Sequence, residues 1–350
     1  MVCFFIPQDK LEDIISEEMD KNQDEQSNWF KIFSHQNAIF VSSLDDYCYM
    51  DYEEPLFIFC ESYGVEIIHE TDYIENIPNN PASTTRYPNG VFILNISEDE
   101  ARIIQEEYGV ICQSIDKMDD GVLVSDGNEF EPNKDDTEYD WNIILANYVY
   151  SEVPSNHLIL IDRYLFADDY SEEMSSALQN IYEIINNLLP TSSLRCPYLI
   201  SFFISQDVLD KYNLSLNEIG EEIDNIIDSL SRNYSINIEI LSMRHHCGLY
   251  KNIHDRFIIT NYSIIKISHM INAFEDGKSK CMQSITAKRL FTKKGLNDYC
   301  DSPIKMHTNV TDAIHRYFTW RENHPDVLDS RYMYNGQLSI MNNHNVYQKY

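Results

Sequence analysis

The sequence predicts an α/β fold in which most strands of the sheets are parallel. Short, continuous apolar runs alternate with segments of helical periodicity, which is the pattern of strands covered by helices on both faces. Hydrophobic residues make up 43% of the chain and aromatic residues 12%, while only 10 of 350 residues are glycine. This composition favours packed layers over a turn-rich barrel, and the length is sufficient for two domains.

The first part of the chain, residues 1–115, is expected to form a small α/β domain with a mostly parallel sheet. Helix-like segments separate its apolar runs, and the clearest is "SEDEARIIQEEY", in which Ser97 and Glu100 form a capping box at the start of a helix. Five runs are expected as strands: 2–6, 37–43, 64–69, 90–96 and 108–115.

An acidic segment follows this first part. Residues 113–140 contain ten acidic residues and two lysines and show little helical periodicity. We therefore expect a linker or exposed loop over 116–145, ahead of a second domain at 146–350.

The second part has the order β-α-β-α-β with further strands, which is again α/β. Its first expected helix, 171–189, carries an apolar stripe that would cover a sheet face. The other expected helix is 215–232, and the expected strands are 157–166, 197–205, 236–243, 254–261 and 263–271.

The net charge of −31 is unevenly distributed. Residues 1–240 hold 11 Lys and Arg against 48 Asp and Glu, whereas residues 241–350 hold 15 against 9. A uniformly acidic protein would repel nucleic acid and anionic membranes. The basic third indicates either an internal charge match with the acidic body or a face for a phosphate-bearing partner that the acidic part gates.

Neither a membrane-spanning segment nor a signal peptide is expected from the sequence. No segment approaches the roughly 20 apolar residues that span a bilayer, and the start, "MVCFFIPQDKLEDII", lacks the basic region of a signal peptide. The eight cysteines are scattered, with no C-x-x-C pair. Free thiols in a reducing cytoplasm are the simplest expectation.

The stretch "HDRFIITN" carries the strongest functional pattern. Its form, H-x-R-x-x-x-x-N, resembles the H-x-K-x-x-x-x-D signature of the phospholipase D superfamily, with His254, Arg256 and Asn261 at the three positions. The resemblance covers about residues 150–345. It implies that His254 attacks phosphorus, that Arg256 neutralises the phosphate oxygens and that Asn261 stands where an aspartate orients the imidazole. The "HDR" form resembles the phospholipase D-like C-terminal module of MIT-domain proteins, for which binding of anionic lipid rather than hydrolysis is implied.

Two departures from that family favour binding over hydrolysis. Asn261 replaces a carboxylate, and Asp255 is expected to face away from His254 because neighbouring residues on a strand point to opposite faces. Active members also combine two motifs, whereas this chain contains one. A true metal-independent phosphodiesterase would therefore need a homodimer that pairs its single motifs.

Further residues are candidates for phosphate contacts. The run "KSKCMQSITAKRLFTKK" interleaves basic residues with Phe291, a composition that could follow a phosphate backbone or form a solvated face. The candidate phosphate-binding residues are Arg244, Arg256, Ser268, Lys288 and Arg289.

Metal sites are weaker alternatives, and no metal or other cofactor is expected. Acids after strand-like runs resemble the positions of carboxylates in PIN-type nucleases, but the spacing is not diagnostic. Three adjacent residues that include two histidines and a cysteine cannot all converge on zinc from a strand. The residues concerned are Asp45, Asp46, Glu70, Asp72, His245, His246 and Cys247.

Three hypotheses follow from the sequence. The first is a phosphodiester- or phosphate-binding phospholipase D-like protein, directed at nucleic acid or a nucleotide and weakly active or non-hydrolytic, with a bacterial defence or toxin context by analogy. The second is a dimeric nuclease or phosphodiesterase that uses His254. The third is an interaction scaffold whose acidic N-terminal domain binds a protein partner.

Overall fold

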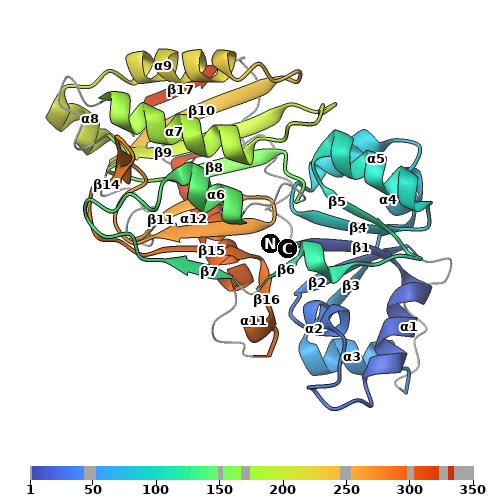
Figure 1. Ribbon diagram of the computed structural model, residues 1–350. Helices are drawn as coiled ribbons and strands as arrows, with labels where there is room; N and C mark the ends of the chain where they lie inside the picture. Colours follow the sequence, from blue (N-terminus) through green and yellow to red (C-terminus); the bar gives the residue numbers. More distant parts are fainter. Residues whose placement is uncertain are drawn as a thin grey trace.

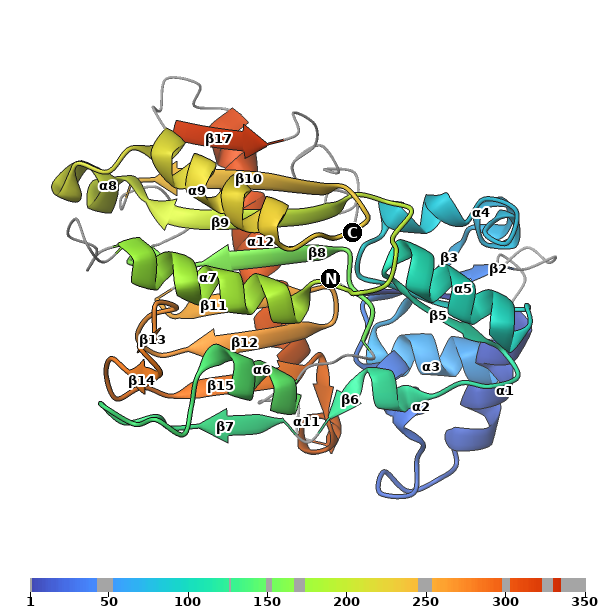
Figure 2. The same cartoon turned by 45° about the horizontal axis from the view of Figure 1, so that its top comes forward.

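The computed structural model describes residues 2–42, 53–125, 127–148, 153–166, 174–244, 254–297, 303–322 and 330–334. Their two large sheets, one of five strands and one of eight, lie side by side, and each is covered by helices (Figures 1 and 2). The α/β class expected from the sequence is confirmed, since the smaller sheet is entirely parallel and both sheets alternate with helices.

The five-stranded sheet has the order β3-β2-β1-β4-β5. Its central strands are buried throughout, which explains their uninterrupted apolar runs. Apolar side chains of α1, α2 and α3 pack on one face, and those of α4 and α5 pack on the other. The bounds are β1 (Cys3–Pro7), α1 (Gln8–Glu18), α2 (Asn28–Ser34), β2 (Ala38–Ser42), α3 (Pro55–Tyr63), β3 (Glu66–His69), α4 (Thr71–Asn76), η2 (Pro81–Arg86), β4 (Gly90–Leu94), α5 (Glu98–Tyr108) and β5 (Ile111–Ser114).

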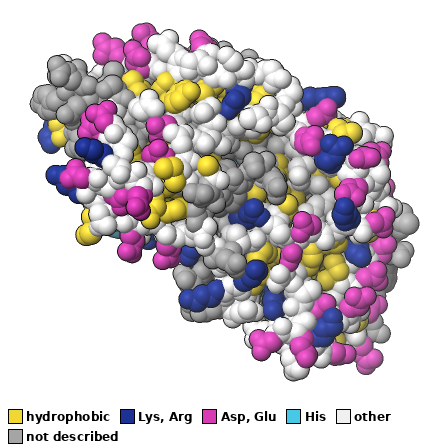
Figure 3. Space-filling model, viewed as in Figure 1, with side chains coloured by type: hydrophobic (Ala, Val, Ile, Leu, Met, Phe, Trp, Pro, Cys, Tyr) yellow, Lys and Arg dark blue, Asp and Glu magenta, His cyan; other side chains and the backbone are white. Residues whose placement is uncertain are grey.

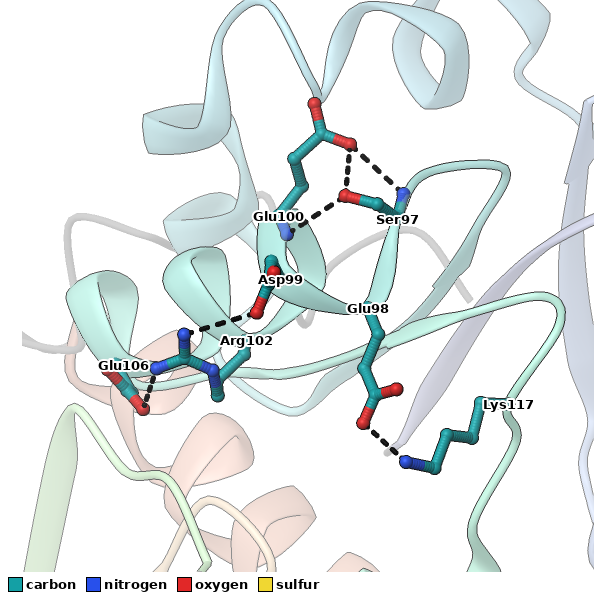
Figure 4. A network of polar contacts seen from close by, with 7 residues as sticks. All are labelled: Ser97, Glu98, Asp99, Glu100, Arg102, Glu106 and Lys117. Carbon is teal, nitrogen blue, oxygen red and sulfur yellow. Dashed lines mark hydrogen bonds and ion pairs between the residues drawn. The ribbon is translucent and has the colours of Figure 1, made fainter.

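The start of α5 confirms the predicted capping box (Figure 4). The Ser97 hydroxyl accepts from the backbone N–H of Glu100 at 3.3 Å, and a Glu100 carboxylate oxygen accepts from the backbone N–H of Ser97 at 3.0 Å. Two amide donors that the first turn of the helix leaves without partners are thereby satisfied.

The eight-stranded sheet has the order β17-β10-β9-β8-β11-β12-β15-β7. Strands β8, β9 and β10 are mutually parallel, and each of the other neighbouring pairs is antiparallel. Helices α6, α7 and α9 cover one face, and α12 packs on the other (Figure 2). The bounds are α6 (Trp141–Tyr148), β8 (His157–Ile161), α7 (Met174–Leu188), β9 (Tyr198–Ser205), α8 (Gln206–Tyr212), α9 (Leu216–Ser229), β10 (Ile236–Met243), β11 (Arg256–Thr260), β12 (Ser263–Ile267), β15 (Ile285–Arg289), α12 (Pro303–Glu322) and β17 (Ser330–Tyr334).

The segment expected as a linker, residues 116–145, contributes to the folded body. It contains η3 (Asp120–Val122), β6 (Val124–Ser125), which pairs with β16 (Phe291–Thr292), and β7 (Asn128–Phe130), which forms the last strand of the larger sheet. Trp141 is fully buried, and its indole N–H donates to the backbone oxygen of Ile271 at 3.0 Å. The remaining short elements are β13 (Phe274–Glu275), β14 (Lys278–Ser279) and α11 (Lys293–Asn297).

The turn between β11 and β12 joins the two sheets. The Tyr262 hydroxyl donates to the backbone oxygen of Gly90 at 2.5 Å and accepts from the backbone N–H of Ile111 at 2.9 Å. Gly109 contacts the backbone of Ser155 so closely that a Cβ would lie 2.3 Å from the Ser155 oxygen, and its φ of +64° also favours glycine. The two sheets therefore share a tightly packed boundary.

Within the described ranges, no helix combines the length and the apolar character that crossing a membrane requires.

Candidate anion-binding site

The strand order brings functional candidates together at one edge of the larger sheet. Strand β11 is antiparallel to both β8 and β12, so the start of β11 lies beside the carboxyl ends of its two neighbours. Arg256 pairs with Ile267 at the end of β12, and Phe257 pairs with Ile161 at the end of β8. The carboxyl ends of parallel strands are where α/β sheets commonly hold their ligands.

Arg256 is the centre of this edge. Its side chain is 14% exposed, and its Nε lies 3.7 Å from Oδ1 of Asp162. Its Nη1 donates to the backbone oxygens of His254, at 3.1 Å, and Ser268, at 3.4 Å. No described residue accepts a hydrogen bond from Nη2. The guanidinium is thus fixed on its inner side and keeps two donors for a further acceptor.

Asp162 provides the carboxylate that pairs with this guanidinium. It follows β8, its side chain is fully buried, and its carboxylate accepts from the backbone N–H groups of Tyr164 (2.8 Å) and Ile271 (2.7 Å). Burial raises the pKa of Asp162 to about 6, and the two backbone N–H groups and Arg256 oppose that rise. The carboxylate is therefore mostly ionised at neutral pH and offsets the charge of Arg256.

An aromatic ring and a second guanidinium lie beside the pair. The Cζ of Arg163 is 4.6 Å and that of Arg256 is 5.3 Å from the centroid of the Tyr164 ring, within the range of cation–π attraction. Tyr164 is 37% exposed. The site therefore combines positive charge with an accessible aromatic group.

His254 lies at the same edge and is exposed. Its backbone oxygen accepts from Arg256, and its imidazole makes no hydrogen bond to any residue the structure describes. The carboxylate of its neighbour Asp255 forms an ion pair with Lys266 of β12 at 2.9 Å. That carboxylate is committed to Lys266, so the structure offers no support for its acting on His254.

Asn261 lies at the opposite end of β11. It is five positions beyond Arg256, which corresponds to about 17 Å at the usual rise of an extended strand. Its Oδ1 accepts from the backbone N–H groups of Asn156 (3.0 Å) and His157 (3.2 Å), and its Nδ2 donates to the backbone oxygen of Pro88. The structure does not bring Asn261 to His254; it places Asn261 in the boundary between the two sheets.

The other predicted phosphate contacts divide between the two ends of the sheet. Ser268 is exposed beside Arg256, where its hydroxyl accepts from the backbone N–H of Ser284 at 2.9 Å. Arg244 lies at the end of β10, where Asp207 (3.8 Å) and Asp210 (3.4 Å) of α8 offset its charge.

Lys288 and Arg289 lie at the far end of the sheet. They pair with Ile264 and Ser263 at the start of β12, on the side of the boundary with the smaller sheet. Arg289 donates through Nη1 to the backbone oxygen of Gly121. The structure therefore does not bring these two residues to Arg256.

Neither Tyr164 nor Asp162 is among the site residues predicted from the sequence. Both belong to the run "LILIDRY", whose polar residues follow the strand directly, and this position is the signal that points to them. Their contact with Arg256 depends on the adjacency of β8 and β11, which are far apart in the chain.

The metal alternatives receive no support from the described residues. Asp45, Asp46 and the stretch 245–247 lie outside these residues. Asp72 lies exposed in the first turn of α4, two positions after the N-cap residue Glu70. No group of three or more His, Cys, Asp or Glu side chains within the described ranges could hold a metal ion. The described cysteines are free thiols: Cys3, Cys60, Cys112, Cys196 and Cys281.

The part of the molecule built on the five-stranded sheet, on the side away from the Arg256 edge, carries many acidic side chains. On the face seen in Figure 3, acidic side chains gather along the outer side of the part built on the five-stranded sheet. An anion would therefore be attracted by the local groups around Arg256 and not by the net charge of −31.

Comparison of the sequence with protein-family models gives no match, and comparison with curated proteins gives no significant match either.

Proposed function

We propose that the edge of the larger sheet at Arg256 binds the phosphate group of a nucleic acid or nucleotide, without efficient hydrolysis. The proposal depends mainly on one observation: a guanidinium is paired with a buried carboxylate, has two Nη2 donors without an acceptor among the described residues, and lies beside the exposed residue His254. A fixed guanidinium with parallel donors is well suited to phosphate oxygens. The resemblance to the phospholipase D superfamily supports the same class of ligand.

Binding is favoured over hydrolysis because no residue within the described ranges is placed to activate His254. A histidine nucleophile or general base needs a partner that fixes its tautomer and orientation. Asn261 is at the other end of the strand, and Asp255 is paired with Lys266. Nucleic acid is favoured over lipid because Tyr164 offers a ring beside the phosphate position, and aromatic rings stack on bases.

The test measures binding of a labelled single-stranded oligonucleotide by fluorescence anisotropy. Asp162→Asn should tighten binding at pH 7.5, because it removes the charge that offsets Arg256. Adding Arg256→Gln to Asp162→Asn should weaken binding about tenfold relative to Asp162→Asn alone, the usual worth of a charge-assisted hydrogen bond. Arg256→Gln is combined with Asp162→Asn because Arg256→Gln alone would leave the buried carboxylate of Asp162 without its partner.

Lys288→Gln is the matched control, since it removes one positive charge from the far end of the same sheet. It should leave the affinity nearly unchanged. Equal losses from Lys288→Gln and from Arg256→Gln would mean that overall charge, and not the Arg256 edge, holds the oligonucleotide.

A further inference from the structure

A cavity of about 440 Å³ lies at the boundary between the two sheets, away from the Arg256 edge. Its walls come from α5, from residues 153–155, and from the end of α7 with the connection to β9. The backbone N–H of Arg195 in that connection donates to the backbone oxygen of Glu107 on α5 at 2.7 Å, which ties the two walls together. The volume is within the range of small-molecule sites.

The end of α7 contributes hydrogen-bond acceptors to the lining. The carboxyl end of α7, a helix of 15 residues, contributes Asn187 and Leu188, and the end of a helix carries partial negative charge. The amide nitrogen of Asn187 donates to Asn142 (2.8 Å) and to the backbone oxygen of Glu183 (2.7 Å), and no described residue donates to its Oδ1.

Glu106 is the one charged side chain among the described lining residues. Its Oε1 accepts from Arg102 at 3.2 Å, whereas Oε2 has no partner among the described residues (Figure 4). Its side chain is 50% exposed. One carboxylate-bearing residue and the carboxyl end of a helix therefore line the same cavity, whose described lining residues include no lysine, arginine or histidine.

The arginines near the cavity already form ion pairs or hydrogen bonds with other residues. Arg102 binds Asp99 as well as Glu106, and Arg195 forms an ion pair with Glu107 at 2.7 Å. Arg232 donates to the backbone oxygen of Asn186, at 2.9 Å, and to its side-chain oxygen. An anion in the cavity would lie near a carboxylate and a helix carboxyl end, so the charge pattern favours a cationic ligand over an anionic one.

We propose that this cavity binds a small organic cation, with its ammonium group at Glu106 and the end of α7 and its aliphatic body against Val153, Leu188 and Leu194. The ammonium donates to Oε2 of Glu106 and to Oδ1 of Asn187 at the end of α7, which gives charge-assisted hydrogen bonds. The apolar residues of the lining cover the methylene groups. This site is separate from the proposed phosphate site.

Titration calorimetry with 1,5-diaminopentane at physiological salt tests the proposal. The diamine should bind saturably, and 1,5-pentanediol, which has the same length and no charge, should not. Glu106→Gln should weaken diamine binding about tenfold, the equivalent of one charge-assisted hydrogen bond. Thr191→Trp, at an exposed position in the lining, should fill the cavity and abolish binding with the fold intact.

Glu98→Gln controls for diffuse attraction to an acidic protein, because Glu98 lies on the same helix but does not line the cavity. It should leave diamine binding unchanged. The proposal fails if the wild-type protein does not bind the diamine, if Glu98→Gln and Glu106→Gln weaken binding equally, or if the diol binds as well as the diamine.

Discussion

Replacing Arg256 with methionine should lower the free energy of unfolding by about 3 kcal/mol at pH 8 and by clearly less at pH 5. Asp162 is fully buried, and removal of one partner of a buried ion pair leaves an uncompensated charge that costs about 3–5 kcal/mol. We expect the lower end of this range because Arg256 is partly exposed and two backbone N–H groups still stabilise the Asp162 carboxylate.

The pH dependence of the stability of the Arg256→Met variant follows from the ionisation of the Asp162 carboxyl group. Burial already raises the pKa of Asp162 from 3.8 to about 6 with Arg256 in place, and loss of the guanidinium raises that pKa further. The folded variant then holds its proton more tightly than the unfolded chain does, so its stability falls as pH rises above about 4. At pH 5 the carboxyl of the variant is protonated and neutral, which removes most of the penalty.

Urea unfolding at the two pH values measures this effect. The double variant Asp162→Asn/Arg256→Met buries no charge and should recover most of the stability, with little dependence on pH. An equal loss for Arg256→Met at pH 5 and pH 8 would show that packing of the arginine stem, and not its pairing with Asp162, accounts for the change.

Replacing Asn261 with aspartate should destabilise the protein by about 3 kcal/mol at pH 7 and should create no phosphodiesterase activity. The amide nitrogen donates to the backbone oxygen of Pro88 and to Oδ1 of Asn156, the latter at 2.9 Å. A carboxylate would place oxygen against these oxygens in a fully buried position, where an unpaired charge is strongly unfavourable.

This substitution restores the aspartate of the family that the motif resembles, so it separates two accounts of Asn261. Asn213→Asp is the control, because Asn213 is exposed and its backbone φ of 53° suits either residue. Unfolding and hydrolysis of a chromogenic phosphodiester should be measured on both variants. A stable Asn261→Asp protein that hydrolyses the diester would contradict the assignment of Asn261 to the boundary.

The regular elements could be predicted because their causes are local. The runs around Phe4, Phe40 and Phe92 are continuously apolar because helices cover both faces of the five-stranded sheet. The helix after Ser97 could be placed because its capping box lies within a few residues. By contrast, β7 is short and largely exposed, so the acidic segment that contains it carries no apolar signal.

The site could be predicted only in part because its geometry depends on strand order. The sequence predicts that Arg256 begins a strand, but the neighbour that supplies Asp162 is about 90 residues earlier and antiparallel. The spacing of the motif contained a further clue: residues five positions apart on an extended strand cannot converge. Strand geometry therefore separates Asn261 from Arg256, whereas the resemblance alone placed them together.

A crystal soak with inorganic phosphate tests the central claim most directly. If the Arg256 edge binds phosphate, the ion will lie within hydrogen-bonding distance of Nη2 of Arg256 and beside the imidazole of His254. In the variant Asp162→Asn/Arg256→Gln, we expect no phosphate at this position. Phosphate bound at Arg244 or Lys288, with the Arg256 edge empty, would contradict it.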